Sequence, residues 1–278
     1  MSASYYSYRV FLTEPAQTEL FNENKEERFR KLFTKVSEEH KIEFVDWGTE
    51  HIVCHYKKLN ENIYIWQLGK KQEFSKPVVL IEKIENVNDV KYPFIYLIFH
   101  IKKQIVFIQM NSSVFQDLDS VKSKMERFFS QELSEGKIIV HLTEISDQRE
   151  FWAKVKEMDS VQEVEFDYNP PNYFRGKNAV DNLVKDVHQE TDFQKFKIIL
   201  QNKVSGLIFD FETFGEHIGR LSSGAGKYII KCVKDGFPYT LKSFLIPFKK
   251  NIVDIDKCEE GKLEDDFDEA NNLNNGNS

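Results

Sequence analysis

The sequence predicts an α+β protein with an N-terminal antiparallel sheet, a middle αβ segment, and a helical C-terminal part closed by a β-hairpin. Strand-like segments follow one another without intervening helices over residues 41–110, which is typical of antiparallel rather than βαβ topology. From residue 111, helical spacing and strand-like segments alternate. The 278 residues are 41% hydrophobic and include 24 phenylalanines, so a sizeable core is available.

The N-terminal half supplies the expected antiparallel sheet. Residues 4–12 are rich in aromatic and β-branched side chains and predict a first strand. Phe29, Leu32, Phe33 and Val36 lie at i, i+3, i+4 and i+7 and predict a helix. The expected strands that follow, taken from their apolar runs, cover residues 42–48, 51–58, 62–70, 77–85, 94–101 and 104–110.

In the second half of the sequence, segments with helical spacing alternate with strand-like segments. Apolar spacing predicts helices over 118–131 and 179–190, and strands over 137–144 and 161–168. Asp147 with Glu150 three residues later predicts a capping box that opens another helix. Residues 196–202 fit a strand or a helix, and a further helix is expected to reach about Leu221.

Three parts of the chain are expected. Pro170 and Pro171 predict a boundary, because proline interrupts a strand ladder and restricts the residue before it. Residues 1–169 would form a mainly antiparallel α+β domain, and residues 172–257 a helical domain with a basic β-hairpin. Residues 258–278 are acidic and poor in apolar side chains, so a disordered tail is expected there.

Charge is distributed unevenly along the chain. The net charge is −7, yet residues 220–250 contain a single acidic residue, Asp235, against seven basic ones. These are the candidate nucleic-acid-binding residues: Arg220, Lys227, Lys231, Lys234, Lys242, Lys249 and Lys250. Clustered cations of this kind bind phosphate backbones. An alternative is that the acidic tail folds over them and competes with an anionic ligand.

The segment SSGAGKYIIKCVKDGFPYTLK, residues 222–242, does not fit a phosphate-binding loop. Such a loop needs a glycine where Leu221 stands and a serine or threonine where Tyr228 stands. Asp235-Gly236 between two strand-like runs instead predicts a hairpin with a type I′ turn. Tyr228, Phe237 or Tyr239 would stack on bases. The alternative is an edge hairpin whose lysines only deter aggregation.

No catalytic residue, metal site or cofactor is predicted. Asp254 and Asp256 resemble the DxK end of a nuclease core, but no acidic partner strand is identified. Asp210, Glu212, Glu216 and His217 fit surface charge with Asp210 as a helix cap. The three cysteines form no CxxC pair. Without a signal peptide or an apolar membrane span in the sequence, a cytoplasmic location is expected.

The order of segments resembles a known family. PFIYLIFHIKKQIVFIQ, then an amphipathic helix, KIIVHLTEI, EVEFDYNPPN and the SSGAGKYIIKCVKDGFPY hairpin look similar to the phage-exclusion proteins of the lambda RexA type and to related abortive-infection proteins. The resemblance covers about residues 90–250. It implies a cytoplasmic, dimeric DNA-binding sensor of anti-phage defence that acts with a membrane partner, and its shared hairpin carries Lys227, Lys231 and Lys234.

The first hypothesis is therefore a non-enzymatic protein of anti-phage defence that binds duplex DNA without strong sequence preference through its C-terminal basic surface. An alternative is a protein-interaction module or inhibitor that recognises a phage or host protein. A third hypothesis is a metal-dependent nuclease.

Overall fold

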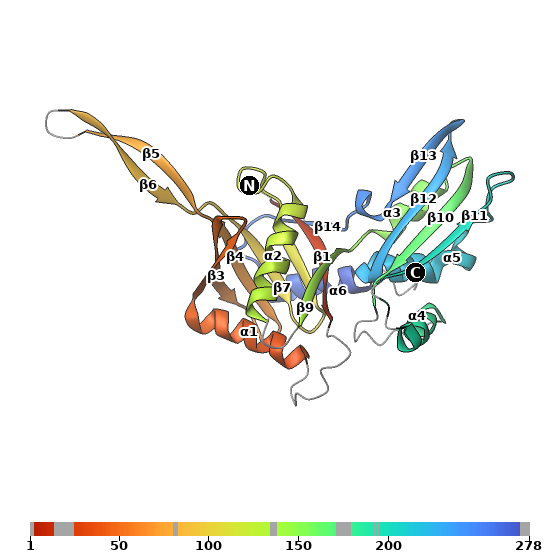
Figure 1. The fold of residues 1–278 in the computed structure, drawn as a ribbon, viewed down its shortest axis with the longest axis horizontal. Coiled ribbons are helices and arrows are strands. Elements are labelled where there is room, and N and C mark those ends of the chain that lie inside the picture. The colour runs from red at the N-terminus through yellow and green to blue at the C-terminus, as the bar shows by residue number, and fades with distance from the viewer. Residues whose placement is uncertain are drawn as a thin grey trace.

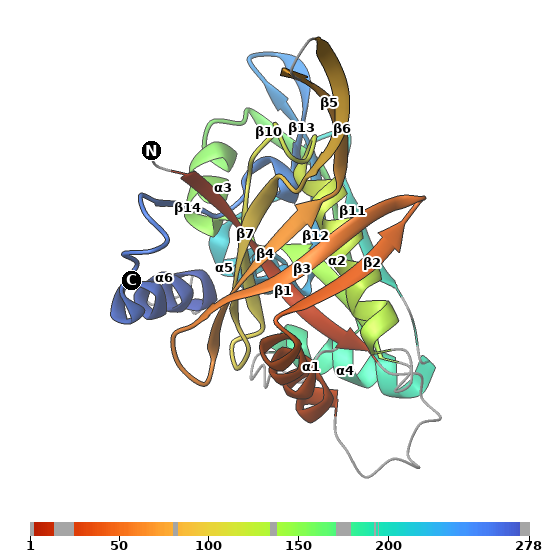
Figure 2. The ribbon, with the colours of Figure 1, turned by 90° about the vertical axis from the view of Figure 1, so that its left-hand side faces the viewer.

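The computed structural model describes residues 3–13, 25–79, 83–133, 138–170, 179–191, 193 and 195–272. Over these residues the chain is a mixed α+β protein with antiparallel sheets and six α-helices (Figures 1 and 2). None of those described helices is long and apolar enough to cross a membrane.

The larger sheet has eight strands in the order β14-β1-β8-β7-β4-β3-β2, with β9 also paired to β1. All its pairings are antiparallel, as expected from the sequence. Its strands are β1 (Ala3–Thr13), β2 (Lys41–Asp46), β3 (Thr49–Lys58), β4 (Ile63–Lys70), β7 (Phe94–His100), β8 (Ile105–Gln109), β9 (Ile139–Glu144) and β14 (Lys249–Ile252).

Helices cover both faces of this sheet, because its central strands are apolar on both sides. In β4, Trp66 packs with helices α1 (Lys25–Glu39) and α2 (Leu118–Glu132), whereas Ile65 faces the cluster that contains α6 (Glu260–Asn272). Phe33 stacks on Trp66 with ring centroids 4.3 Å apart. The main core therefore lies between the sheet, α1 and α2.

The smaller sheet has the order β11-β10-β12-β13. Its strands are β10 (Ser160–Tyr168), β11 (Phe196–Gln201), β12 (Gly226–Lys234) and β13 (Phe237–Lys242). Helices α3 (Gln148–Val155), α4 (Ala179–Thr191) and α5 (Phe211–Arg220) each contribute buried side chains to its core. The expectation of a helical C-terminal part is therefore wrong, since a four-stranded sheet organises this region.

The two sheets do not divide at the double proline. Strand β10 precedes Pro170 and pairs with β11 and β12, which follow it. Strand β14 and helix α6 return to the larger sheet, where β14 pairs with β1. A boundary between residues 169 and 172 would therefore separate strands of one sheet.

Two local predictions from sequence are confirmed. Asp147 and Asp210 are N-caps whose carboxylates accept hydrogen bonds from backbone N–H groups of the first turn. The capping box expected at Asp147 is not completed, because the Asp147 N–H donates to the Ile246 carbonyl and Glu150 pairs with Lys154. Asp235 and Gly236 both have positive φ and connect β12 to β13, as a type I′ hairpin turn requires.

The acidic C-terminal segment is helical, which corrects the expectation of disorder for residues 260–272. Leu263, Phe267 and Ala270 lie at i, i+4 and i+7 of α6, and all three are buried against the larger sheet. Phe267 stacks on Phe107 with ring centroids 4.2 Å apart. Burial of this apolar stripe offsets the ordering entropy, which the overall composition of the segment did not predict.

The strand expected over 77–85 is also wrong. Strands β5 (Gln72–Val79) and β6 (Ile84–Lys91) form a two-stranded sheet of their own. This β5–β6 pair, called the arm below, projects from the end of β4 away from both larger sheets (Figure 1). The chain returns from it at Pro93, whose carbonyl accepts a hydrogen bond from the Lys70 N–H.

A buried histidine in β3 makes the stability of the fold depend on pH. His51 packs between Phe44 and Phe115, and its burial, together with Lys124, lowers its pKa to about 4. The unfolded chain takes up this proton near pH 6.5. We expect His51 to cost about 3 kcal/mol of stability progressively as the pH falls from 6.5 to 4.

The measurement is urea unfolding at pH 7 and pH 4.5. His51→Phe is expected to flatten the pH dependence relative to wild type, whereas His141→Gln, at an exposed site, is expected to leave it unchanged. Equal pH slopes for wild type and His51→Phe would contradict the assignment.

Candidate interaction surfaces

The glycines that begin the β12–β13 hairpin serve a steric role. Helix α5 passes through a single wider turn at Leu221–Ala225 into β12. A Cβ on Gly226 would lie 2.1 Å from the Asp167 carbonyl oxygen on β10, and one on Gly224 would lie 2.5 Å from the Arg9 Cβ. Close backbone approach therefore explains this glycine pair without a phosphate.

The outer face of the smaller sheet carries alternating charges rather than a positive platform. Lys231 on β12 lies across from the carboxylates of β10, and its Nζ is 2.6 Å from Glu163 Oε1. Lys197 on β11 pairs with Glu165 and lies 3.7 Å from Asp167. The cations of this face therefore have acidic neighbours on β10.

Two further candidate residues are paired elsewhere. Arg220 forms an ion pair with Asp181 of α4 in which both side chains are about 10% exposed, and burial lowers the pKa of Arg220 to about 10. Lys234 Nζ lies 2.6 Å from Glu157. Hydrogen bonding to Glu157 raises the pKa of Lys234, and the same contact lowers the pKa of Glu157.

Lys249 and Lys250 belong to the other sheet, on β14. Lys250 Nζ is 2.8 Å from Asp266 and also pairs with Glu269, both on α6. Burial acts to lower the pKa of Lys250, but these two carboxylates raise it overall. The structure thus does not bring the seven candidate residues together on one sheet.

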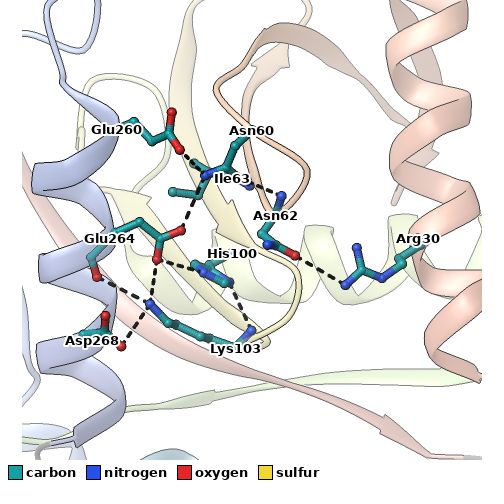
Figure 3. A network of polar contacts seen from close by, with 9 residues as sticks. All are labelled: Arg30, Asn60, Asn62, Ile63, His100, Lys103, Glu260, Glu264 and Asp268. Carbon is teal, nitrogen blue, oxygen red and sulfur yellow. Dashed lines mark hydrogen bonds and ion pairs between the residues drawn. The ribbon is translucent and has the colours of Figure 1, made fainter.

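Helix α6 places its carboxylates over several basic and amide side chains of the larger sheet (Figure 3). Lys103 Nζ lies 2.7 Å from Glu264 and 3.0 Å from Asp268. His100 Nδ1 accepts a hydrogen bond from the Lys103 N–H, so its Nε2–H donates to Glu264 at 3.2 Å. Asn60 donates to Glu260 at 2.7 Å.

The acidic segment does cover basic residues, but only one of the seven candidates, Lys250, is among them. The network neutralises Lys250 from the candidate set, together with Lys103 and Arg149, which the sequence did not single out. Sequence reasoning could not identify these pairs, because Lys103 and Glu264 lie 161 positions apart.

Lys227, Lys242 and Lys249 have no ion pair with another described residue. Lys242 lies over the Phe244 ring, 5.4 Å from its centroid. Of the three aromatic residues expected to stack on bases, Phe237 and Tyr239 are exposed, whereas Tyr228 is buried with its hydroxyl 3.4 Å from Ser146.

The acidic residues considered for metal chemistry stand apart. Asp254 accepts a hydrogen bond from the Asp256 N–H and lies 3.5 Å from Lys257. The His217 ring stacks on Phe166, and its Nδ1 contacts the Tyr168 hydroxyl. Within the described ranges no group of three His, Cys, Asp or Glu residues is placed to hold a metal ion.

The arm has two unlike faces. On one face, side chains contact each other: Lys76 pairs with Asp89, and Lys91 lies over the Phe74 ring. The other, called the exposed face, consists of residues that are all exposed: Glu73, Ser75, Pro77, Val79, Ile84, Asn86, Asn88 and Val90. Val79 and Ile84 lie opposite each other at its outer end and are 78% and 69% exposed.

The exposed face is also without a cation. In strands β5 and β6 three acidic side chains stand against two lysines, and Glu73 is the sole charged residue of the exposed face. Such a surface does not attract a polyanion, while its exposed aliphatic groups fit a protein partner.

Trp47 lies in the turn between β2 and β3, beside the base of the arm. Asp46 pairs with Thr49, so Trp47 and Gly48 form a two-residue loop in which both have positive φ. Lys71, which precedes β5, binds Glu50 at 2.7 Å and so joins this turn to the arm. Trp47 is 91% exposed.

A tryptophan in this position is unusual on two counts. Bulky residues are unfavourable at positive φ, where a type I′ turn prefers Asn-Gly. A fully exposed indole gains nothing from the fold, yet tryptophan is among the residues most enriched at the centre of protein interfaces. The sequence signal was the Trp47-Gly48 pair between two alternating strands, which the sequence reasoning did not use.

The chain was compared with known protein families, curated proteins and solved structures. These comparisons found no match.

Proposed function

We propose that this chain works by binding another protein, without chemistry of its own. The observation that carries the proposal is the arm: a two-stranded ribbon that projects from the body and exposes Val79 and Ile84 on a face without cations. An isolated hairpin of this kind is at best marginally stable in water, so a partner that covers it would stabilise it.

Trp47 supplies the aromatic anchor beside the arm. Interfaces draw most of their affinity from a few residues of this kind, surrounded by contacts that exclude water. The resemblance to phage-exclusion proteins would place the binding in anti-phage defence, with a phage, host or membrane protein as partner. The three free cysteines fit a reducing compartment such as the cytoplasm.

The test uses Trp47→Asn. Asparagine tolerates positive φ, so this variant is expected to gain about 1 kcal/mol of stability in urea unfolding and to lose its partner. The measurement is binding of wild type and variant to immobilised lysate of phage-infected cells at about 1 M salt, where charge attraction is screened, followed by titration of the purified partner.

Val253→Asn is the matched control, because Val253 is 67% exposed but follows β14, away from the arm. It should bind like wild type. A Trp47→Asn variant that binds the purified partner with unchanged affinity would reject the proposal.

A second candidate is nucleic-acid binding at the β12–β13 hairpin. Two observations favour it: Lys227 and Lys242 lack an ion pair with other described residues, and Phe237 and Tyr239 are exposed on the opposite face of the same hairpin, nearer its turn. Four of the seven expected cations are neutralised, so this surface is narrower than the sequence indicated. A low-salt mobility shift on duplex DNA that Lys227→Glu with Lys242→Glu abolishes would favour this candidate over protein binding.

A further inference from the structure

The two long edges of the arm differ in the backbone N–H and C=O groups that they offer to an added strand. In an antiparallel pair, residues that exchange hydrogen bonds alternate with residues whose N–H and C=O groups point outward. Pro77 has no N–H and faces Asn86, so this pair is one of the outward-pointing ones. The outward groups on β6 therefore belong to Ile84, Asn86, Asn88 and Val90.

A separate hydrogen bond agrees with this assignment of the outward-pointing residues. The Val90 N–H donates to the carboxylate of its neighbour Asp89 at 2.9 Å, rather than across to β5. The free edge of β6 thus presents a row of outward backbone groups with no proline among them. On β5 the corresponding edge is blocked, because Pro77 removes a donor at its centre.

We infer that the β6 edge of the arm pairs antiparallel with the β6 edge of a second copy of this chain. This makes a four-stranded ribbon from two marginal hairpins, which meets the usual requirement of three or more strands for independent stability. A two-fold axis allows β6 to pair with β6 of the second copy, because every contact of residue i with residue j is then repeated as a contact of j with i.

The charges on β6 favour a register centred on Asn88 over one centred on Val87. Centred on Asn88, the pairing places Glu85 opposite Lys91 of the second copy twice, and Asn86 opposite Val90. Centred on Val87, it would place Glu85 opposite Asp89 and Lys83 opposite Lys91, which are like charges. Lys91 has no carboxylate partner among the described residues of its own chain. Glu85 pairs with Lys83 of its own chain, and Lys91 of the second copy would add a second cation to that carboxylate.

This inference deepens the proposed function and rests on it, since the arm remains the binding element. The edge is used by the second copy, and the exposed face stays open. The two exposed faces then join into one surface, so Val79 and Ile84 of both copies lie on the same side of a wider ribbon.

The test is sedimentation velocity of the full chain over a concentration series, for wild type and two proline variants. Asn88→Pro removes an N–H that the hairpin does not use but that the pairing needs. Ser75→Pro is the matched control, because Ser75 lies opposite Asn88 and its N–H points to the other edge. We expect Asn88→Pro to weaken the dimer at least about tenfold and Ser75→Pro to leave it unchanged.

A second measurement reports the register. Opposite residues of a hydrogen-bonded antiparallel pair have Cα atoms about 5.5 Å apart, within disulfide range. Asn88→Cys should therefore form a covalent dimer under mild oxidation, while Asn86→Cys should not. A chain that stays monomeric below about 100 μM, or an Asn88→Pro variant as dimeric as wild type, would overturn the inference.

The experiments distinguish failure of the partner-binding proposal from failure of the edge-pairing proposal. If Trp47→Asn loses the protein partner but sediments as a dimer, the edge pairing stands on its own. If Asn88→Pro is monomeric and still binds the partner, the proposed function does not need the second copy.

Discussion

Phe267→Ala is expected to lower the free energy of unfolding by about 4 kcal/mol, because a buried phenylalanine leaves a cavity when it is truncated. Phe267 is fully buried, stacks on Phe107 and lies edge-on to His100. Without it, α6 keeps Leu263 and Ala270 as its remaining buried side chains. The measurement is urea unfolding at neutral pH.

Phe237→Ala is the control for this change, since Phe237 is 74% exposed and its truncation should cost under about 0.5 kcal/mol. A loss of about 1 kcal/mol or less for Phe267→Ala, on the order of a surface change, would mean that α6 does not dock on the larger sheet. The pairing of Lys103 and Lys250 with its carboxylates would then be lost as well.

Gly226→Ala is expected to destabilise the smaller sheet by about 3 kcal/mol. The new Cβ would meet the Asp167 carbonyl oxygen at 2.1 Å and the Leu221 side chain at 2.6 Å. Relief would require β12 to move away from β10, to which it is hydrogen-bonded along its length. The measurement is again urea unfolding, with far-UV circular dichroism.

Gly261→Ala serves as the matched variant. Gly261 lies in the first turn of α6, and a Cβ added there would have no atom of the described chain within 4 Å outside its own helical turn. Alanine should therefore be neutral or stabilise the helix by up to about 1 kcal/mol. Equal effects of the two substitutions would show that close backbone approach is not the reason for a glycine at position 226.

Local sequence patterns predicted most of the secondary structure. The helical spacing of Phe29, Phe33 and Val36 and the caps at Asp147 and Asp210 predicted elements that the structure contains. These signals succeed because they depend on neighbours within a few residues. The arm was not predicted, because a purely local pattern was misleading there. The apolar run Pro77–Ile81 predicts one continuous strand, whereas β5 ends at Val79.

The candidate site depended on distant partners that no local pattern reports. Counting charges over residues 220–250 found the cations, but Asp181, Glu163 and Asp266 neutralise Arg220, Lys231 and Lys250 from other elements. The helical stripe of Leu263 and Phe267 was visible in the sequence. The acidic composition around it outweighed that stripe in the prediction of disorder.

The central claim, that the arm is covered by protein when the chain works, can be measured at the amide groups of β6. Residue-resolved hydrogen exchange of the full chain at low and high concentration would separate the two sets of N–H groups. We predict that at low concentration Glu85, Val87 and Asp89, whose N–H groups pair with β5, exchange more slowly than Asn86 and Asn88, and that Asn86 and Asn88 become protected as concentration rises. Fast exchange of Asn86 and Asn88 at all concentrations, and equally in the presence of the purified partner, would contradict the account.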